Sequence, residues 1–255
     1  MVSVIVHPPT DPSCASMNLT DKVAVVTGAS SGLGRHFSEQ LIERGAEVFG
    51  LARSMDTLNA IRDDLGHAFH PIDCDVRDKD AVATAFDTVM DASGRLDVLI
   101  NNAGLGQFGP VDETDLDTWD VQQETNVRGV FLCTRAAAPI MKQQNGNEGF
   151  GGHIVNIASI AGLLGNPNIS AYNASKFAVR GFSEATMKEL RGDGIKVSCV
   201  YPGSIETNFF DVAGVDMTDN PMQPQDVAST VMHLIEMPDN YLISEVVMRP
   251  LRPRG

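Results

Sequence analysis

The chain has 255 residues, of which 43% are hydrophobic and 20% are charged, and its formal net charge is −14. This length and composition suit one globular α/β domain with a sizeable core. The acidic balance argues against nucleic acid and membrane surfaces as partners, because both require positively charged faces. The four cysteines are scattered, with no C-x-x-C pair, which argues against metal centres and disulfide frameworks and favours a cytoplasmic protein with reduced thiols.

The first 18 residues carry three prolines and no periodic pattern, so we expect residues 1–18 to form a flexible extension. Met17 is a candidate for the true start of the protein. Residues 2–6 are too short an apolar run for a secretory signal, and no run approaches the roughly 18 residues of a membrane span. Residues 19–255 are then expected to form a single domain.

A strand, a glycine-rich turn and a helix open the predicted domain. The strand covers residues 22–27, the turn residues 28–34 and the helix residues 33–44. This arrangement directs backbone N–H groups and a helix N-terminus at a diphosphate. Glycine is needed where a Cβ atom would collide with the phosphates or with the packing of the helix. Glycines alone could form a simple tight turn, so their place in the first strand–helix unit supports the prediction.

The end of the second predicted strand, residues 46–52, bears on cofactor choice. An acidic residue there binds the ribose 2′-hydroxyl of NAD, whereas an arginine accommodates the 2′-phosphate of NADP. This chain has Arg53, whose guanidinium can bind a phosphate in bidentate fashion. Alternatively, Arg53 is a solvated turn residue and Ser54 caps the next helix. Arg35 is a second cation near the same position, unless its helix face points to solvent.

The next two strands also end at candidate cofactor contacts. The third strand, residues 68–72, leads to Asp75, which could accept a hydrogen bond from the adenine amine or simply form a turn. After a helix over residues 78–92, a fourth strand over residues 96–101 ends in the sequence NNAG, residues 101–104. Small residues after a parallel strand allow a cofactor to approach the backbone.

A long helix is predicted over residues 116–142, and Asn126 lies within it among apolar neighbours. A buried amide must be satisfied by hydrogen bonds, although Asn126 could do no more than bridge turns of its helix. After a glycine-containing loop, a strand over residues 195–201 leads to a Pro-Gly pair. The last strand is predicted within residues 241–250.

The most specific chemistry follows the short strand predicted over residues 154–157. Ser159 leaves the end of this strand, and the next helix carries Tyr172 and Lys176 four residues apart, hence on one face. An ammonium that close would lower the pKa of a phenol from its usual value of about 10. Such a phenol exchanges a proton with a carbonyl or alcohol oxygen, and a serine hydroxyl can stabilise that oxygen. The alternative is a half-buried Tyr172 beside a solvated Lys176.

Taken together, these motifs resemble the short-chain dehydrogenase/reductase family over roughly residues 19–250. Ser159 precedes Tyr172 by thirteen residues, the spacing usual in that family. The resemblance implies a Rossmann-type, doubly wound α/β fold with a parallel seven-stranded sheet and three helices on each face. The motifs that carry it are TGASSGLG at 27–34, DV at 75–76, NNAG at 101–104, Asn126, Ser159, YNASK at 172–176 and Pro202-Gly203 followed by Thr207.

The resemblance also implies roles for four catalytic residues. Tyr172 is expected to act as the general acid/base, and Ser159 to orient and polarise the substrate oxygen. Lys176 is expected to lower the pKa of Tyr172 and to hold the hydroxyls of the nicotinamide ribose. Asn126 is expected to keep a water that links Lys176 to solvent.

The expected cofactor is NADP(H), with NAD(H) less favoured. Ile205 and Thr207 are expected to contact its carboxamide. The residues expected to bind the cofactor are Gly28, Ser30, Ser31, Gly32, Leu33, Gly34, Arg53, Asp75, Val76, Asn102, Ala103, Gly104, Tyr172, Lys176, Pro202, Gly203, Ile205 and Thr207.

We therefore expect an NADP(H)-dependent oxidoreductase, a carbonyl reductase, that interconverts a ketone or aldehyde and an alcohol. The alternatives are an NAD-dependent alcohol or hydroxy-acid dehydrogenase of the same fold, and a dinucleotide-binding sensor without turnover. Residues 206–221 are predicted to form a lid. The edge strand and the two long helices commonly build dimers and tetramers in this family, so we expect a homo-oligomer, such as a homotetramer.

The substrate is predicted to be a small or medium, mostly apolar carbonyl compound. Any of the residues that suggest this could instead belong to the ordinary core. The candidates to line the substrate pocket are Leu105, Gln107, Phe108, Ile160, Leu164, Asn166, Phe209 and Phe210.

Overall fold

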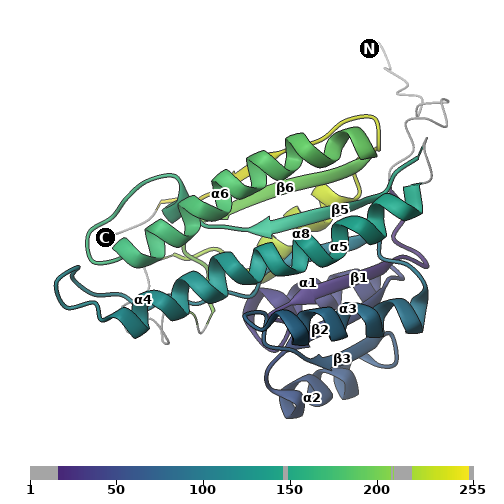
Figure 1. The fold of residues 1–255 in the computed structure, drawn as a ribbon, viewed down its shortest axis with the longest axis horizontal. Helices are drawn as coiled ribbons and strands as arrows, with labels where there is room; N and C mark the ends of the chain where they lie inside the picture. The colour runs from purple at the N-terminus through teal and green to yellow at the C-terminus, as the bar shows by residue number, and fades with distance from the viewer. Residues whose placement is uncertain (1–16, 146–148, 208, 210–219, 253–255) are drawn as a thin grey trace, which may run out of the picture.

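The computed structural model of the protein describes residues 17–145, 149–207, 209 and 220–252. Within these residues, seven parallel strands form one sheet in the order β3-β2-β1-β4-β5-β6-β7 (Figure 1). The strand order reverses between β1 and β4, and sheets of this kind bind ligands at that switch point, outside the carboxyl ends of the strands. The strands are β1 Val23–Thr27, β2 Glu47–Ala52, β3 Phe69–Asp73, β4 Val98–Asn101, β5 Gly152–Ile157, β6 Ile195–Pro202 and β7 Glu245–Met248.

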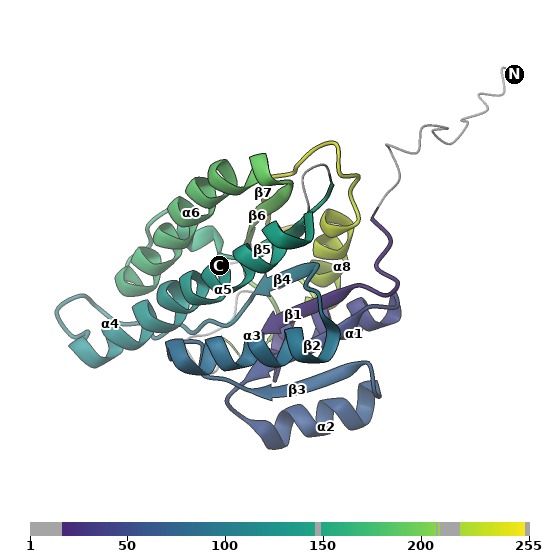
Figure 2. The ribbon, with the colours of Figure 1, turned by 45° about the vertical axis from the view of Figure 1, so that its right-hand side comes forward.

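Helices cover both faces of the sheet (Figure 2). The helical segments are α1 Gly32–Glu43, α2 Met55–Leu65, α3 Lys79–Ser93, α4 Leu116–Gln123, η2 Glu124–Arg128, α5 Gly129–Asn145, η3 Ile160–Gly162, α6 Ser170–Leu190, η4 Arg191–Asp193 and α8 Pro224–Ile235. In the hydrophobic core, α1, α2 and α8 pack on one face, and α3, α5 and α6 pack on the other. The predicted doubly wound fold is confirmed. None of the described helices combines the length and apolar character needed to cross a bilayer.

Coverage of both faces explains why the central strand β1 is continuously apolar. Along β1, Ala24 and Val26 belong to the core on the α1 side, whereas Val23 and Val25 belong to the core on the α3 side. All of these side chains are buried. A strand with alternating polar residues would place them in one of the two cores, so an uninterrupted apolar run is the pattern that a parallel, doubly covered strand requires.

The prediction of one long helix over residues 116–142 is wrong in its middle. The segment divides into α4, the π-helical turn η2 and α5. A π turn inserts an extra residue into the helix and is frequent at functional sites. Here it contains Asn126, whose side chain bonds both the backbone N–H and the carbonyl of Leu105, at 2.9 and 2.8 Å. Local helix propensity cannot predict these hydrogen bonds, because Leu105 and Asn126 are far apart in the sequence.

The chain enters the domain before β1. Met17 is buried, and its backbone N–H donates to the carbonyl of Glu236, directly after α8, at 3.0 Å. Met17 is thus part of the folded domain, although the sequence pattern placed it in the extension. Residues 1–16 lie outside the described residues, so for them the extension stays a prediction.

Candidate active site

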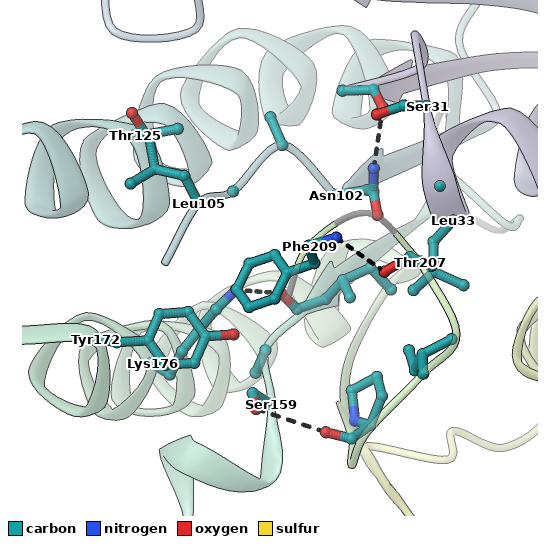
Figure 3. Close-up of a pocket in the computed structure, with 18 of the residues that line it drawn as sticks. Ser31, Leu33, Asn102, Leu105, Thr125, Ser159, Tyr172, Lys176, Thr207 and Phe209 are labelled. Carbon is teal, nitrogen blue, oxygen red and sulfur yellow. Dashed lines mark hydrogen bonds between the residues drawn. The ribbon is translucent and has the colours of Figure 1, made fainter. Parts of the chain in front are cut away.

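A cavity of about 860 Å³ opens at the carboxyl ends of the central strands. It contains nearly all the residues predicted from the sequence to bind a dinucleotide or carry out chemistry (Figure 3). Of that set, Gly34 and Asn126 do not line it. The predicted site residues that do are Gly28, Ser30, Ser31, Gly32, Leu33, Arg53, Asp75, Val76, Asn102, Ala103, Gly104, Ser159, Tyr172, Lys176, Pro202, Gly203, Ile205 and Thr207.

The glycine turn between β1 and α1 forms one wall of the cavity. Gly28 and Gly32 have φ angles of +65° and +51°, which L residues rarely adopt. A Cβ atom on Gly28 would lie 2.9 Å from the Cα atom of Ala103, so the turn packs directly against the β4–α4 loop. Gly28 and Gly32 also line the cavity, where a helix N-terminus suits a diphosphate.

Gly34 fits the second of the two predicted reasons for glycine, the packing of the helix. A Cβ atom at this position would lie 2.1 Å from the carbonyl oxygen of Gly28. Such an approach is impossible without moving backbone, so Gly34 lets the first turn of α1 pack against the glycine turn. It acts on the site by packing rather than by touching a ligand.

Thr27 is a site residue that the sequence analysis passed over. Its Oγ1 accepts hydrogen bonds from the backbone N–H groups of Asn102 and Ala103, at 3.0 and 2.9 Å. The side chain of Asn102 donates to the carbonyl of Thr27 at 3.0 Å. These bonds fasten the NNAG loop to the glycine turn. The signal was present, because Thr27 opens the TGASSGLG motif.

The far end of the cavity is lined by two arginines. Arg53 lines this end and is exposed, so its role toward a phosphate stays a prediction. Arg77 is the second cation, and its guanidinium holds both carboxylate oxygens of Asp75 at 2.6 to 3.0 Å. This hydrogen bonding lowers the pKa of Asp75. Arg35, considered as the second cation from the sequence, lies elsewhere, because it pairs with Asp64 at 2.8 Å.

Ser159, Tyr172 and Lys176 meet at the near end of the cavity (Figure 3). Tyr172 and Lys176 are 7% and 5% exposed, so the reading of a solvated lysine is wrong. The Nζ of Lys176 donates to the carbonyl of Ile157 at 2.9 Å and lies 5.7 Å from the centre of the Tyr172 ring. Ser159 leaves β5, and its Oγ lies 3.5 Å from the carbonyl oxygen of Pro202.

The pKa of Tyr172 is raised, whereas the sequence analysis predicted that it would be lowered. Burial raises the pKa of Tyr172 to about 12, and hydrogen bonding with Ser159 opposes this rise. Burial also lowers the pKa of Lys176 to about 8. The prediction considered only the attraction between an ammonium and a phenolate, whereas both groups lose solvation here and the ammonium is held by a carbonyl.

Asn126 joins three segments rather than the turns of one helix. Besides its two bonds to Leu105, its Nδ2 donates to the Oγ of Ser175 on α6 at 3.0 Å. Its Oδ1 and the Nζ of Lys176 flank Gly104, where a Cβ atom would lie 3.2 and 3.5 Å from them. Asn126 therefore fixes the NNAG loop relative to α6.

A row of polar residues crosses the sheet beneath α6. Asn101, Asn156, Cys199 and Glu245 occupy matching register positions on neighbouring strands. Asn101 donates to the Oδ1 of Asn156 at 2.8 Å, and Asn156 donates to the Oγ of Ser183 on α6 at 2.9 Å. The amide nitrogens of both residues are paired, whereas the buried Oδ1 of Asn101 has no partner among the described residues. Paired buried amides specify one geometry. This row fixes how α6 lies on the sheet, with its catalytic face toward the cavity.

The predicted substrate residues divide into three groups. Gln107 and Leu164 do not line the cavity, and Phe210 lies outside the described residues, as does most of the predicted lid. The predicted residues that line the cavity are Leu105, Phe108, Ile160, Asn166 and Phe209.

Comparison with known proteins identifies the family. The family model described as short chain dehydrogenase matches residues 22–216. The chain belongs to the short-chain dehydrogenase family. The predicted resemblance is therefore confirmed, and the protein is an oxidoreductase of this family.

Relatives in sequence and in structure agree with this assignment. An uncharacterized oxidoreductase of Staphylococcus aureus strain USA300 is 33% identical over 91% of this chain and 99% of its own. A metagenomic short-chain oxidoreductase solved with NADP is 35% identical and superposes with a TM-score of 0.80, over 92% of this chain and 99% of that one. A 3-ketoacyl-(acyl-carrier-protein) reductase from Brucella melitensis solved with NADH is 26% identical, with a TM-score of 0.83 over 91% and 98% of the two chains.

Proposed function

We propose that this short-chain dehydrogenase is an NADP(H)-dependent carbonyl reductase that interconverts a small-molecule carbonyl compound and an alcohol. The observation that carries the proposal is that one cavity joins a Ser159–Tyr172–Lys176 group to an open glycine turn and to Arg53. A protein that only senses a dinucleotide, without catalysis, does not need the Ser159–Tyr172–Lys176 group. The NADH and NADP complexes of the structural relatives support a nicotinamide dinucleotide as the cofactor.

The cavity suits such a cofactor on its own geometry. The glycine turn lines the cavity at the N-terminus of α1, and the two arginines supply cations at the far end. When bound, the dinucleotide supplies the hydride, while the protein supplies position and charge. The residues proposed to hold it are Gly28, Ser30, Ser31, Gly32, Leu33, Arg53, Asp75, Val76, Asn102, Ala103, Gly104, Tyr172, Lys176, Pro202, Gly203, Ile205 and Thr207.

The proton chemistry follows from the buried group. Tyr172 is protonated at neutral pH, because its pKa of about 12 lies well above 7, and it donates its proton to the carbonyl oxygen during reduction. The Ser159 hydroxyl donates a hydrogen bond to the same oxygen as negative charge develops there. The Lys176 ammonium stabilises the phenolate that the transfer leaves behind. Asn126 positions the loop and α6 between which this transfer occurs.

Replacing Arg53 tests cofactor choice, for which the NADH-bound relative makes NAD the alternative. The Arg53→Asp variant removes the cation for a 2′-phosphate and adds a carboxylate for a 2′-hydroxyl. We expect the ratio of kcat/KM with NADPH to kcat/KM with NADH to fall by about tenfold or more. The control is Arg62→Asp, the same charge change on the exposed side of α2, which should leave the ratio unchanged. An equal ratio in both variants would refute the role of Arg53.

The pH dependence of reduction should report Lys176. We expect kcat/KM to be level at neutral pH and to fall above pH of about 8, because the ammonium loses its proton there. The fall should approach tenfold per pH unit. Tyr172, with its pKa near 12, stays protonated and contributes nothing to this fall. The measurement is the steady-state rate with NADPH across the alkaline range, and a level profile through about pH 10 would contradict this account.

We also propose that the protein forms homo-oligomers. Phe131 on α5, Phe177 on α6 and Val247 on β7 are 45%, 42% and 49% exposed. Large apolar side chains on two long helices and an edge strand are costly in water and suit contact with a second copy. Sedimentation equilibrium is expected to show a dimer or tetramer, and a monomer at micromolar concentration would contradict this.

We also propose that the protein is cytoplasmic, because its described cysteines are free thiols. Cys74, Cys133 and Cys199 are buried and free. Buried thiols without disulfide partners suit a reducing compartment. Cys14 lies outside the described residues.

A further inference from the structure

Past Tyr172, the cavity ends in a region that the proposed cofactor contacts do not use. We call it the substrate end. Its lining is mostly apolar, with the amide of Asn166 and, beside Leu105, the hydroxyl of Thr125 as polar groups. Its apolar residues are Leu105, Phe108, Ile160, Ile169 and Phe209.

Two aromatic rings lie near the Tyr172 ring on this side, and Figure 3 shows one of them, that of Phe209. The centre of the Phe108 ring lies 5.5 Å from that of Tyr172, and the centre of the Phe209 ring lies 5.6 Å from it. The two phenylalanines are 6.3 Å apart in an edge-to-face arrangement. Both are partly exposed, so part of each ring faces the cavity. Rings in such tilted arrangements favour a further aromatic partner.

The backbone is shaped to hold these rings. Gly106 is buried, and a Cβ atom there would lie 2.7 Å from ring atoms of both Phe108 and Phe209. The β4–α4 loop therefore comes close enough for the rings to pack against its main chain. Their positions are a feature of the fold rather than of two freely rotating side chains.

Charge is the second property of the substrate end. Among the described residues that line the cavity, the cations are Arg53 and Arg77 at the far end and Lys176 beside Tyr172. The sequence of residues 208–219 contains three aspartates and neither lysine nor arginine, so that segment has no cation to contribute. An anionic group buried without a partner is strongly disfavoured.

We infer that the substrate is an uncharged carbonyl compound with an aromatic ring next to the carbonyl, and that Phe108 and Phe209 determine this specificity. The inference rests on the proposed function. With the carbonyl oxygen at Tyr172 and Ser159, an adjacent ring lies against Phe108 and Phe209. The same features disfavour carboxylates.

Three related ketones test the inference with NADPH and the full-length protein. Methyl phenylglyoxylate and phenylglyoxylate differ in charge, whereas methyl phenylglyoxylate and methyl cyclohexylglyoxylate differ in aromaticity. We expect kcat/KM for the phenyl ester to exceed that for the acid by about a hundredfold or more. It should exceed that for the cyclohexyl ester by about tenfold. Conjugation makes the phenyl ketone intrinsically less reactive than the cyclohexyl ketone, so this preference must come from the protein.

Substitutions in the substrate end test which residues cause the preference for the phenyl ester. Phe108→Leu and Phe209→Leu should bring the phenyl-to-cyclohexyl ratio toward one while retaining turnover of the cyclohexyl ester. Phe150→Leu is the matched control, because Phe150 lies just before β5, at the opposite end of the sheet, and should leave the ratio unchanged. Asn166→Lys, which adds a cation to the substrate end, should narrow the gap between ester and acid by about tenfold.

The outcomes separate the inference from the proposed function. Equal rates with acid and ester, or an unchanged phenyl preference in both leucine variants, would overturn the inference. Reduction of aliphatic ketones alone would also overturn it, and would leave the carbonyl reductase assignment standing. Failure to reduce any ketone or aldehyde while NADPH binds would instead contradict the proposed function, and the inference with it.

Discussion

The Tyr172→Phe variant is expected to lose carbonyl reduction by roughly 10²–10⁴-fold, the range for removal of a general acid. The phenyl ring remains, so its contacts with Phe108 and Phe209, at 5.5 and 5.6 Å between ring centres, persist. We therefore expect the dissociation constant for NADPH to change by less than about threefold. The measurements are steady-state turnover and cofactor titration by fluorescence.

Tyr201→Phe is the matched control for the loss of a buried phenol hydroxyl. Tyr201 is fully buried, and its hydroxyl donates to Glu245 at 2.7 Å, away from the cavity. We expect this variant to keep full turnover and to lose about 1 kcal/mol of unfolding free energy. If Tyr172→Phe were as active as the wild type, or if both variants lost activity equally, Tyr172 would not be the acid.

The order of the elements could be predicted from the sequence because it depends on local patterns. The central strand β1 is a short apolar run, as a parallel strand covered on both faces favours. The strands β1 to β6 are each followed by a loop and at least one helix. The π turn at η2 could not be predicted in this way. It exists because Asn126 must reach the backbone of Leu105 and the hydroxyl of Ser175, and neither contact is local.

The sequence predicted which residues form the candidate site better than it predicted the pKa values of those residues. The spacing of the motif predicted that Ser159, Tyr172 and Lys176 lie together. Ser159 follows the carboxyl end of β5, and Tyr172 and Lys176 lie near the start of the next long helix, α6, at the same edge of the sheet. Spacing cannot report burial, however, and burial decides the pKa values of Tyr172 and Lys176. Arg77 was likewise missed, because only the fold shows that a residue two positions after Asp75 turns back to it.

A substitution at Gly34 tests whether this glycine is needed for the packing of the protein or for contact with a ligand. Gly34→Ala would place a methyl group 2.1 Å from the carbonyl oxygen of Gly28, so α1 must move away from β1. We expect the protein without cofactor to lose about 3 kcal/mol of unfolding free energy, since neither backbone can yield cheaply. For a chain of this size, that corresponds to a fall in Tm of roughly 6–12 °C by calorimetry.

Gly192→Ala separates this effect from the general consequence of replacing a glycine. Gly192 is exposed in η4, and a Cβ atom there would meet nothing within 4 Å. This variant should match the wild type or gain up to about 1 kcal/mol, because alanine restricts the unfolded chain. If Gly34→Ala kept wild-type Tm without cofactor and only weakened NADPH binding, Gly34 would be a ligand contact. Because the clash is with the protein's own backbone, we expect the loss of stability to appear before any ligand is added.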